Sequence, residues 1–132
     1  NRGPNLLNSE ALMKEAKNSV NIVTTEKGFL RKVEGLLPTM EKASKRGVKI
    51  KIAAPMSKDT KAAVDSLKGI AEVRHNNKVN SRFVTVDSKD VVFMTLHDDA
   101  VHPSYDLGIW VKTPYFATAM DQMFNTAWNI KN

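Results

Sequence analysis

The chain of 132 residues contains no cysteine. This absence excludes disulfide bonds, thiolate zinc sites and cysteine nucleophiles, and it is compatible with a reducing cytosol. No apolar run approaches the ~20 residues that a membrane-spanning helix needs. Residues 1–5 also lack the apolar segment of a signal peptide. We therefore expect a cytoplasmic protein that does not contact a membrane.

Phosphate-loop and metal-binding motifs are also missing. The six glycines are dispersed, so no glycine-rich phosphate loop is present. His97, Asp98, Asp99 and His102 are close in sequence and could in principle bind a metal. A metal site, however, needs three or four ligands in fixed geometry, which a polar loop does not provide. We expect neither a metal nor a cofactor.

An initiator methionine is absent as well, because the chain begins with Asn1. Hydrophobic residues make up 42% and charged residues 26%, as in ordinary globular domains, and no linker or repeat interrupts the chain. We expect one domain over residues 1–132 that is the C-terminal fragment of a longer chain. The net charge of +6 is spread over scattered lysines, which favours solubility over a nucleic-acid-binding surface.

Apolar periodicity predicts alternating helices and strands in the first half and a strand meander in the second. Helices are expected at 10–17, 26–45, from 57 or 59 to 69, and from 114 onward, and strands at 20–24, 48–54, 71–75, 82–86, 91–96 and 107–112. Pro38 should kink or split the second helix. Strands joined through helices are usually parallel. The expected fold class is α/β, with a mixed, mostly parallel sheet and helices on both faces.

Five polar residues lie in or next to the predicted hairpin of strands 82–86 and 91–96. Asn80 precedes the hairpin, Arg82 begins its first strand, and Asp87 follows Arg82 after four residues; Thr95 lies in the second strand and His97 follows it. This pattern resembles the phospholipase D superfamily signature H-x-K-x4-D followed by G-S-x-N. In that comparison Asn80 stands at the histidine, Arg82 at the lysine and Asp87 at the aspartate, while Thr95 and His97 stand at the serine and asparagine.

Three further segments share this resemblance: residues 46–50 (R-G-V-K-I), 72–74 and 124–128. The resemblance implies an α/β/α sandwich. It also implies the loss of catalysis, because the histidine of active members attacks phosphorus and the amide of Asn80 is not nucleophilic. Arg82 would still supply a cation suited to oxyanions.

A non-catalytic domain of this size resembles the C-terminal part of TrmB-family archaeal transcription regulators. That resemblance implies a homodimer that senses a small anionic or polyhydroxylated ligand. It also implies that DNA is contacted only through an N-terminal winged helix outside this chain. The ligand-binding residues would be those of the degraded motif: Asn80, Arg82, Asp87, Thr95 and His97.

Two other functions stay open on the residues alone. The chain could be a phosphodiesterase or nuclease that uses His97 or a metal, or an oligomerisation module without a ligand. Asp87 has an alternative role as well, because an aspartate next to Ser88 is common in turns. Trp110 and Trp128 are expected in the core or in a dimer contact.

Overall fold

The structure is a computed structural model that describes residues 6–77, 82–94, 107–112 and 114–129. Its elements are, in chain order, β1 (Leu6–Asn8), α1 (Ser9–Glu15), β2 (Ser19–Val23), α2 (Glu26–Lys45), β3 (Lys49–Ala54), the 3-10 turn η1 (Lys58–Thr60), α3 (Lys61–Ser66), β4 (Glu72–His75), β5 (Phe83–Val86), β6 (Asp90–Met94), β7 (Leu107–Lys112) and α4 (Pro114–Trp128).

The strands form one mixed sheet in the order β1-β7-β6-β5-β2-β3-β4. Strands β2, β3 and β4 are parallel to one another, as the strand–helix alternation predicted. All other neighbours are antiparallel, including β5 beside β2. The prediction of a mostly parallel sheet is therefore wrong. The reason is that β5, β6 and β7 are joined as a meander, and a meander adds antiparallel neighbours.

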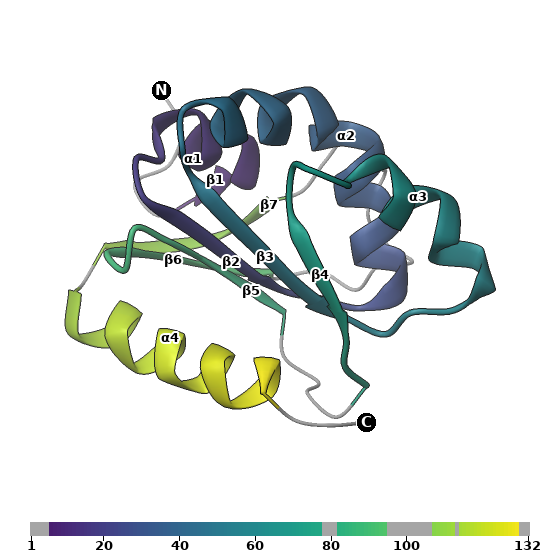
Figure 1. The fold of residues 1–132 in the computed structure, drawn as a ribbon. Coiled ribbons are helices and arrows are strands. Elements are labelled where there is room, and N and C mark those ends of the chain that lie inside the picture. Colours follow the sequence, from purple (N-terminus) through teal and green to yellow (C-terminus); the bar gives the residue numbers. More distant parts are fainter. Residues whose placement is uncertain (1–5, 78–81, 95–106, 113, 130–132) are drawn as a thin grey trace.

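Helices cover both faces of this sheet, as predicted. Helices α1, α2 and α3 lie on one face, and α4 lies on the other (Figure 1). Successive strand residues point to opposite faces. Ile22 and Val84 accordingly join the core under α1 and α2, whereas Phe83 and Val91 join the core under α4.

Two local features differ from what the sequence indicated, for identifiable reasons. Helix α2 has the predicted ends and continues through Pro38 as one helix, so of the predicted kink or split the split does not occur. Both Pro38 and Glu34, whose carbonyl loses its N–H partner, lie on the exposed side, where water can replace the missing hydrogen bond. Strand β1 was missed because three residues are too few to show an alternating pattern; it pairs with β7.

Asp87 ties the β5–β6 hairpin to the start of β2. The turn consists of residues 87–89; Asp87 and Ser88 have positive φ angles of 54° and 56°, and the Lys89 N–H donates to the Val86 carbonyl at 3.0 Å. The Asp87 carboxylate accepts hydrogen bonds from the backbone N–H groups of Lys17 (3.0 Å), Asn18 (2.7 Å) and Ser19 (3.0 Å). The backbone N–H of Asp87 donates to the Ser19 carbonyl at 2.9 Å.

These contacts change the acidity of the carboxyl group. Burial raises the pKa of Asp87, but the backbone donors of Ser19, Asn18 and Lys17, together with the Lys89 charge, lower it more. The pKa therefore lies below its ordinary value of 3.8. A carboxyl whose pKa falls on folding stabilises the folded state above its unfolded pKa, and this stabilisation is lost as the pH falls through the folded pKa.

We predict that Asp87→Asn lowers the free energy of unfolding at pH 7 by about 1–2 kcal/mol, a value reduced because the side chain is partly exposed. Urea unfolding at a series of pH values measures this difference. It should shrink toward zero as the pH falls below 3.8. The control is Asp65→Asn, which removes an exposed ion pair with Lys68 at 3.6 Å and should change little. If the difference in free energy of unfolding between the wild type and Asp87→Asn does not vary with pH, the assigned role of the Asp87 charge is wrong.

Candidate functional site

The parallel strands β2, β3 and β4 have their carboxyl ends on the same side of the sheet, and we call this side the carboxyl-end edge. Helix α2 starts there. Thr24 directly follows β2, and Arg82 directly precedes β5. Because Val23 is paired with Phe83, the next residues outward, Thr24 and Arg82, are neighbours at this edge. In open α/β sheets, ligands bind beyond the carboxyl ends of the parallel strands.

Thr24 has a buried hydroxyl without a hydrogen bond. The residue is 2% exposed, and its backbone N–H donates to the Ala53 carbonyl at 3.1 Å. Its Oγ1 is buried and has no hydrogen-bond partner, as far as the described residues go. Leaving a buried hydroxyl unsatisfied costs about 1–3 kcal/mol, so the position is unfavourable for folding alone.

Gly28, in the first turn of α2, is the point where these groups meet. A Cβ atom placed on Gly28 would lie 2.2 Å from Thr24 Oγ1 and 3.4 Å from Arg82 Nη2. The hydroxyl of Thr25 caps the helix by accepting from the Gly28 N–H at 3.0 Å. The threonine hydroxyl and the guanidinium therefore approach the helix at its N-terminus, where the helix dipole favours negative charge.

Two more cations are buried one helical turn further along α2. Arg31 and Lys32 are 6% and 2% exposed. They follow Gly28 by three and four positions, so they lie on the same side of the helix as Gly28. Each of them, like Arg82, interacts with other groups of the protein. We call Arg31, Lys32 and Arg82 the basic cluster; Arg82 lies beside the N-terminus of α2, and Arg31 and Lys32 lie in the following turn of this helix.

The structure separates two residues of the predicted ligand site. Arg82 and Asp87 lie at opposite ends of β5, about 16 Å apart at ~3.3 Å per strand residue. Asp87 is bonded to the backbone of residues 17–19, far from the basic cluster. The other predicted residues, Asn80, Thr95 and His97, lie outside the described residues. Ligand binding by any of the five stays a prediction.

Sequence reasoning missed Thr24, Gly28 and Lys32. A signal for Lys32 existed: it lies three residues after Phe29 and four before Leu36, so it is a charged residue inside the apolar stripe of α2. Charged residues at such positions are rarely fully buried unless they are paired. The unsatisfied hydroxyl of Thr24 had no signal in the sequence, because it depends on the register between β2 and β5.

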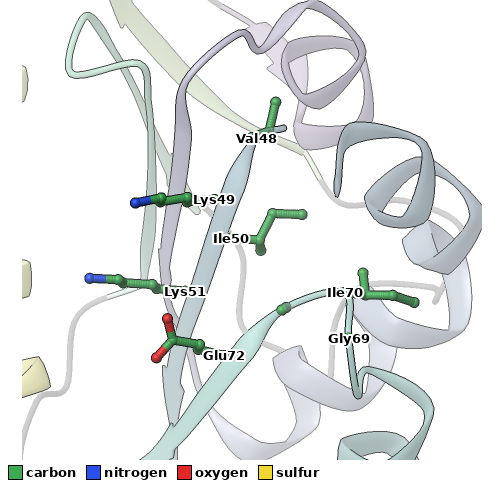
Figure 2. A pocket seen from close by; sticks show the side chains of 8 residues that line it. Val48, Lys49, Ile50, Lys51, Gly69, Ile70 and Glu72 are labelled. Atoms are coloured by element: carbon green, nitrogen blue, oxygen red, sulfur yellow. The ribbon is translucent and has the colours of Figure 1, made fainter. Parts of the chain in front are cut away.

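An open groove of about 410 Å³ lies near the amino ends of β3 and β4, opposite to the carboxyl-end edge, along residues 48–51 and 69–72. Figure 2 shows Lys49, Lys51 and Glu72 on one side of the sheet and Val48, Ile50 and Ile70 on the other, toward the helices. The groove arises where the chain before β4 diverges from β3, since their pairing starts only at Lys51. It contains none of the predicted site residues.

Within the described ranges, no group of three histidine, aspartate or glutamate side chains could hold a metal ion. His97, Asp98, Asp99 and His102 lie outside these ranges. Across the same residues, no helix is both long and apolar enough to span a bilayer.

Comparison with known proteins identifies the family. The family described as "Transcriptional regulator TrmB, EBD N-terminal subdomain" matches residues 5–132. The structure of TrmBL2, described as an archaeal chromatin protein with a novel mode of DNA binding, has a similar fold, with a TM-score of 0.69 and 24% identity. That match covers 93% of this chain but only 51% of TrmBL2, so the chain spans about half the length of that protein. Curated proteins give no match.

The TrmB resemblance predicted from the residue pattern is thus confirmed at the level of the family. The family match extends over nearly the whole chain. The chain therefore belongs to the family of TrmB transcriptional regulators, in which it corresponds to the EBD N-terminal subdomain.

Proposed function

We propose that this chain is a non-catalytic sensing and dimerisation domain of a TrmB-like regulator, and that it binds a small anionic ligand beside Arg82. The observation that carries the proposal is the meeting of three groups at Gly28: the Arg82 guanidinium, the unsatisfied Thr24 hydroxyl and the N-terminus of α2. Each of the three favours a negatively charged oxygen.

The chemistry of these groups limits the ligand. Arginine presents planar N–H donors that match a carboxylate or a phosphate, and the Thr24 hydroxyl can donate one more hydrogen bond. Two further basic side chains, Arg31 and Lys32, are buried in the next turn of α2. We therefore favour phosphorylated or carboxylated small molecules over neutral sugars.

Burial of the site supports a sensing role. Thr24 is only 2% exposed, so an anion can reach its hydroxyl only if neighbouring groups move apart. Binding would then favour the opened arrangement over the closed one, and a ligand shifts a conformational equilibrium by its difference in affinity for the two states. A regulator needs a coupling of this kind between ligand and shape.

A histidine-based phosphodiesterase is not supported by the side chain at the motif position. Asn80 offers an amide and Arg82 offers a guanidinium, and these groups can bind a phosphate but are not nucleophiles that would attack it. The phospholipase D-like origin of the pattern stays a prediction.

We also propose that the chain forms a homodimer in the cytoplasm and that the DNA contacts of the regulator come from another part of the protein.

Thr24→Val tests the ligand site, because it replaces the hydroxyl with a methyl group of similar size. Without ligand, we expect the free energy of unfolding to rise by about 1 kcal/mol, since an unsatisfied buried group is removed. With phosphate, sugar phosphates, nucleotides or dicarboxylates, the wild type should gain about 2.7 kcal/mol at a concentration of 100 Kd. Thermal and urea unfolding measure both effects, and Thr24→Val should lose most of the ligand effect.

The control for this variant is Thr118→Val at an exposed position of α4, which should keep the full ligand effect. Arg82→Gln should lose the effect together with Thr24→Val. If no anion stabilises the wild type, or if Thr24→Val responds as the wild type does, the proposed ligand site is wrong. Turnover of a chromogenic phosphodiester by the wild type would contradict the non-catalytic assignment.

Gly28→Ala tests the close approach itself. Alanine normally stabilises a helix interior by about 1 kcal/mol relative to glycine. Here the new Cβ would lie 2.2 Å from Thr24 Oγ1, and we expect a loss of about 1–3 kcal/mol from overpacking. Gly35→Ala, at an exposed position of the same helix, is the matched control and should stabilise.

A double variant separates the clash from other causes. Thr24→Ala removes the hydroxyl that Gly28→Ala meets, so the effects of the two substitutions should be non-additive and Gly28→Ala should cost less stability in the Thr24→Ala background. Urea unfolding of the four proteins gives the coupling. Additive effects, or a Gly28→Ala variant as stable as Gly35→Ala, would contradict the described packing.

A further inference from the structure

Helix α4 has an outer face without charge. The exposed large hydrophobic side chains found within the described residues all lie on it: Tyr115 is 92% exposed, Met123 47% and Phe116 40%. The other exposed positions of the helix carry small or neutral side chains, namely Pro114, Thr118, Ala119, Gln122, Asn125 and Thr126. Contiguous exposed apolar side chains rimmed by polar ones are typical of interaction sites.

The single charged residue of α4 points toward the sheet. The Asp121 carboxylate accepts hydrogen bonds from the Thr85 and Ser88 hydroxyls, both at 2.5 Å, and from the Asn21 amide at 3.2 Å. These bonds hold α4 against β2 and the hairpin. They also leave the outer face of the helix neutral.

The other helices differ sharply from α4 in this respect. The exposed positions of α2 include Lys27, Glu34, Glu41, Lys42 and Lys45, and those around η1 and α3 include Lys58, Asp59, Lys61, Asp65 and Lys68. The chain as a whole carries a net charge of +6. Two copies that approach through most of their surface would therefore repel each other.

The two flanks of α4 differ as well. On one flank, Lys51 and Arg74 lie over the Trp128 ring, with 5.5 Å and 4.4 Å to the ring centroid, so this side is basic. On the other flank, Phe93 of β6 contacts Phe116, with 5.5 Å between ring centroids. The apolar surface thus continues from Phe93 through Phe116 to Tyr115.

We infer that the outer face of α4 is the surface on which a second copy of this chain docks, with the two helices packed around a two-fold axis. This inference rests on the dimerisation in the proposed function. A two-fold contact uses the same patch on both copies, so a neutral patch avoids facing like charges. Tyrosine, phenylalanine and methionine are enriched in such contacts.

The geometry of α4 identifies the residue nearest the axis. The exposed apolar face runs from Tyr115 to Met123, and Ala119 lies four residues from each. In an antiparallel helix pair, Tyr115 of one copy would then pack near Met123 of the other, and Ala119 would face its own counterpart. The small side chain of Ala119 allows the helices to come close at the axis.

Cross-linking tests this arrangement directly, because the chain has no cysteine of its own. Ala119→Cys should form a disulfide-linked dimer under mild oxidation, since a residue at the axis can bring its Cα atoms within the ~4.4–6.8 Å that a disulfide needs. Ala62→Cys, at an exposed position of α3, is the matched control and should stay monomeric on a denaturing gel. Absence of the Ala119→Cys cross-link in a protein that is dimeric in solution would overturn the inference.

Sedimentation of the wild type and of Tyr115→Lys with Met123→Lys gives the second measurement. We expect the double variant to weaken dimerisation by at least roughly tenfold, while Ala62→Lys leaves it unchanged. Circular dichroism checks that the double variant and Ala62→Lys remain folded, as expected because all three positions are exposed.

If the double variant dimerises like the wild type, the dimer contact lies elsewhere, and the role of α4 is overturned although dimerisation itself is not. A wild type that is monomeric at all concentrations would overturn dimerisation itself, and the anion response of Thr24 would still be tested separately.

Discussion

The pairing of β5 with β2 is the constraint on which the rest of the structure depends. Its register runs from Val23 opposite Phe83 to Val20 opposite Val86. This register places Arg82 beside Thr24 at one end and Asp87 beside the start of β2 at the other. A slip of one residue would turn every side chain of β5 to the opposite face and would move the Asp87 carboxylate away from its backbone donors. The two ends of β5 are therefore fixed together.

The same register also decides how α4 is held. Because side chains alternate along β5, Val84 and Val86 pack under α2 while Phe83 and Thr85 face α4. The hydroxyl of Thr85 meets Asp121 only on that face. Because the Asp121 carboxylate is hydrogen-bonded toward the sheet, the outer face of α4 carries no charge. The register of β5 therefore determines both the position of Arg82 and the contact of Thr85 with α4.

Local structure was predictable because its signals are local. The apolar stripe of α2 and the alternation in β3 predicted both elements to within one residue, and Pro114 marked the start of α4. The sheet order was not predictable in this way. Alternation shows that β5 and β6 form a hairpin, but it does not show whether the hairpin joins β4 or crosses to β2. That choice depends on long-range packing on both faces, and because of it the mixed sheet is mostly antiparallel and not mostly parallel as expected.

The spacing of Arg82 and Asp87 also shows that a sequence pattern does not identify the long-range neighbours of a residue. Four residues separate Arg82 from Asp87, and β5 is itself four residues long. The spacing therefore equals the length of this strand and places the two side chains at its opposite ends, which the sequence pattern alone did not show. The neighbours of Arg82 come instead from the end of β2 and the first turn of α2, which precede it by more than fifty residues. An anion site at this edge would be assembled by strand register, and its most informative residue is Thr24, whose hydroxyl gains nothing from the folded chain alone.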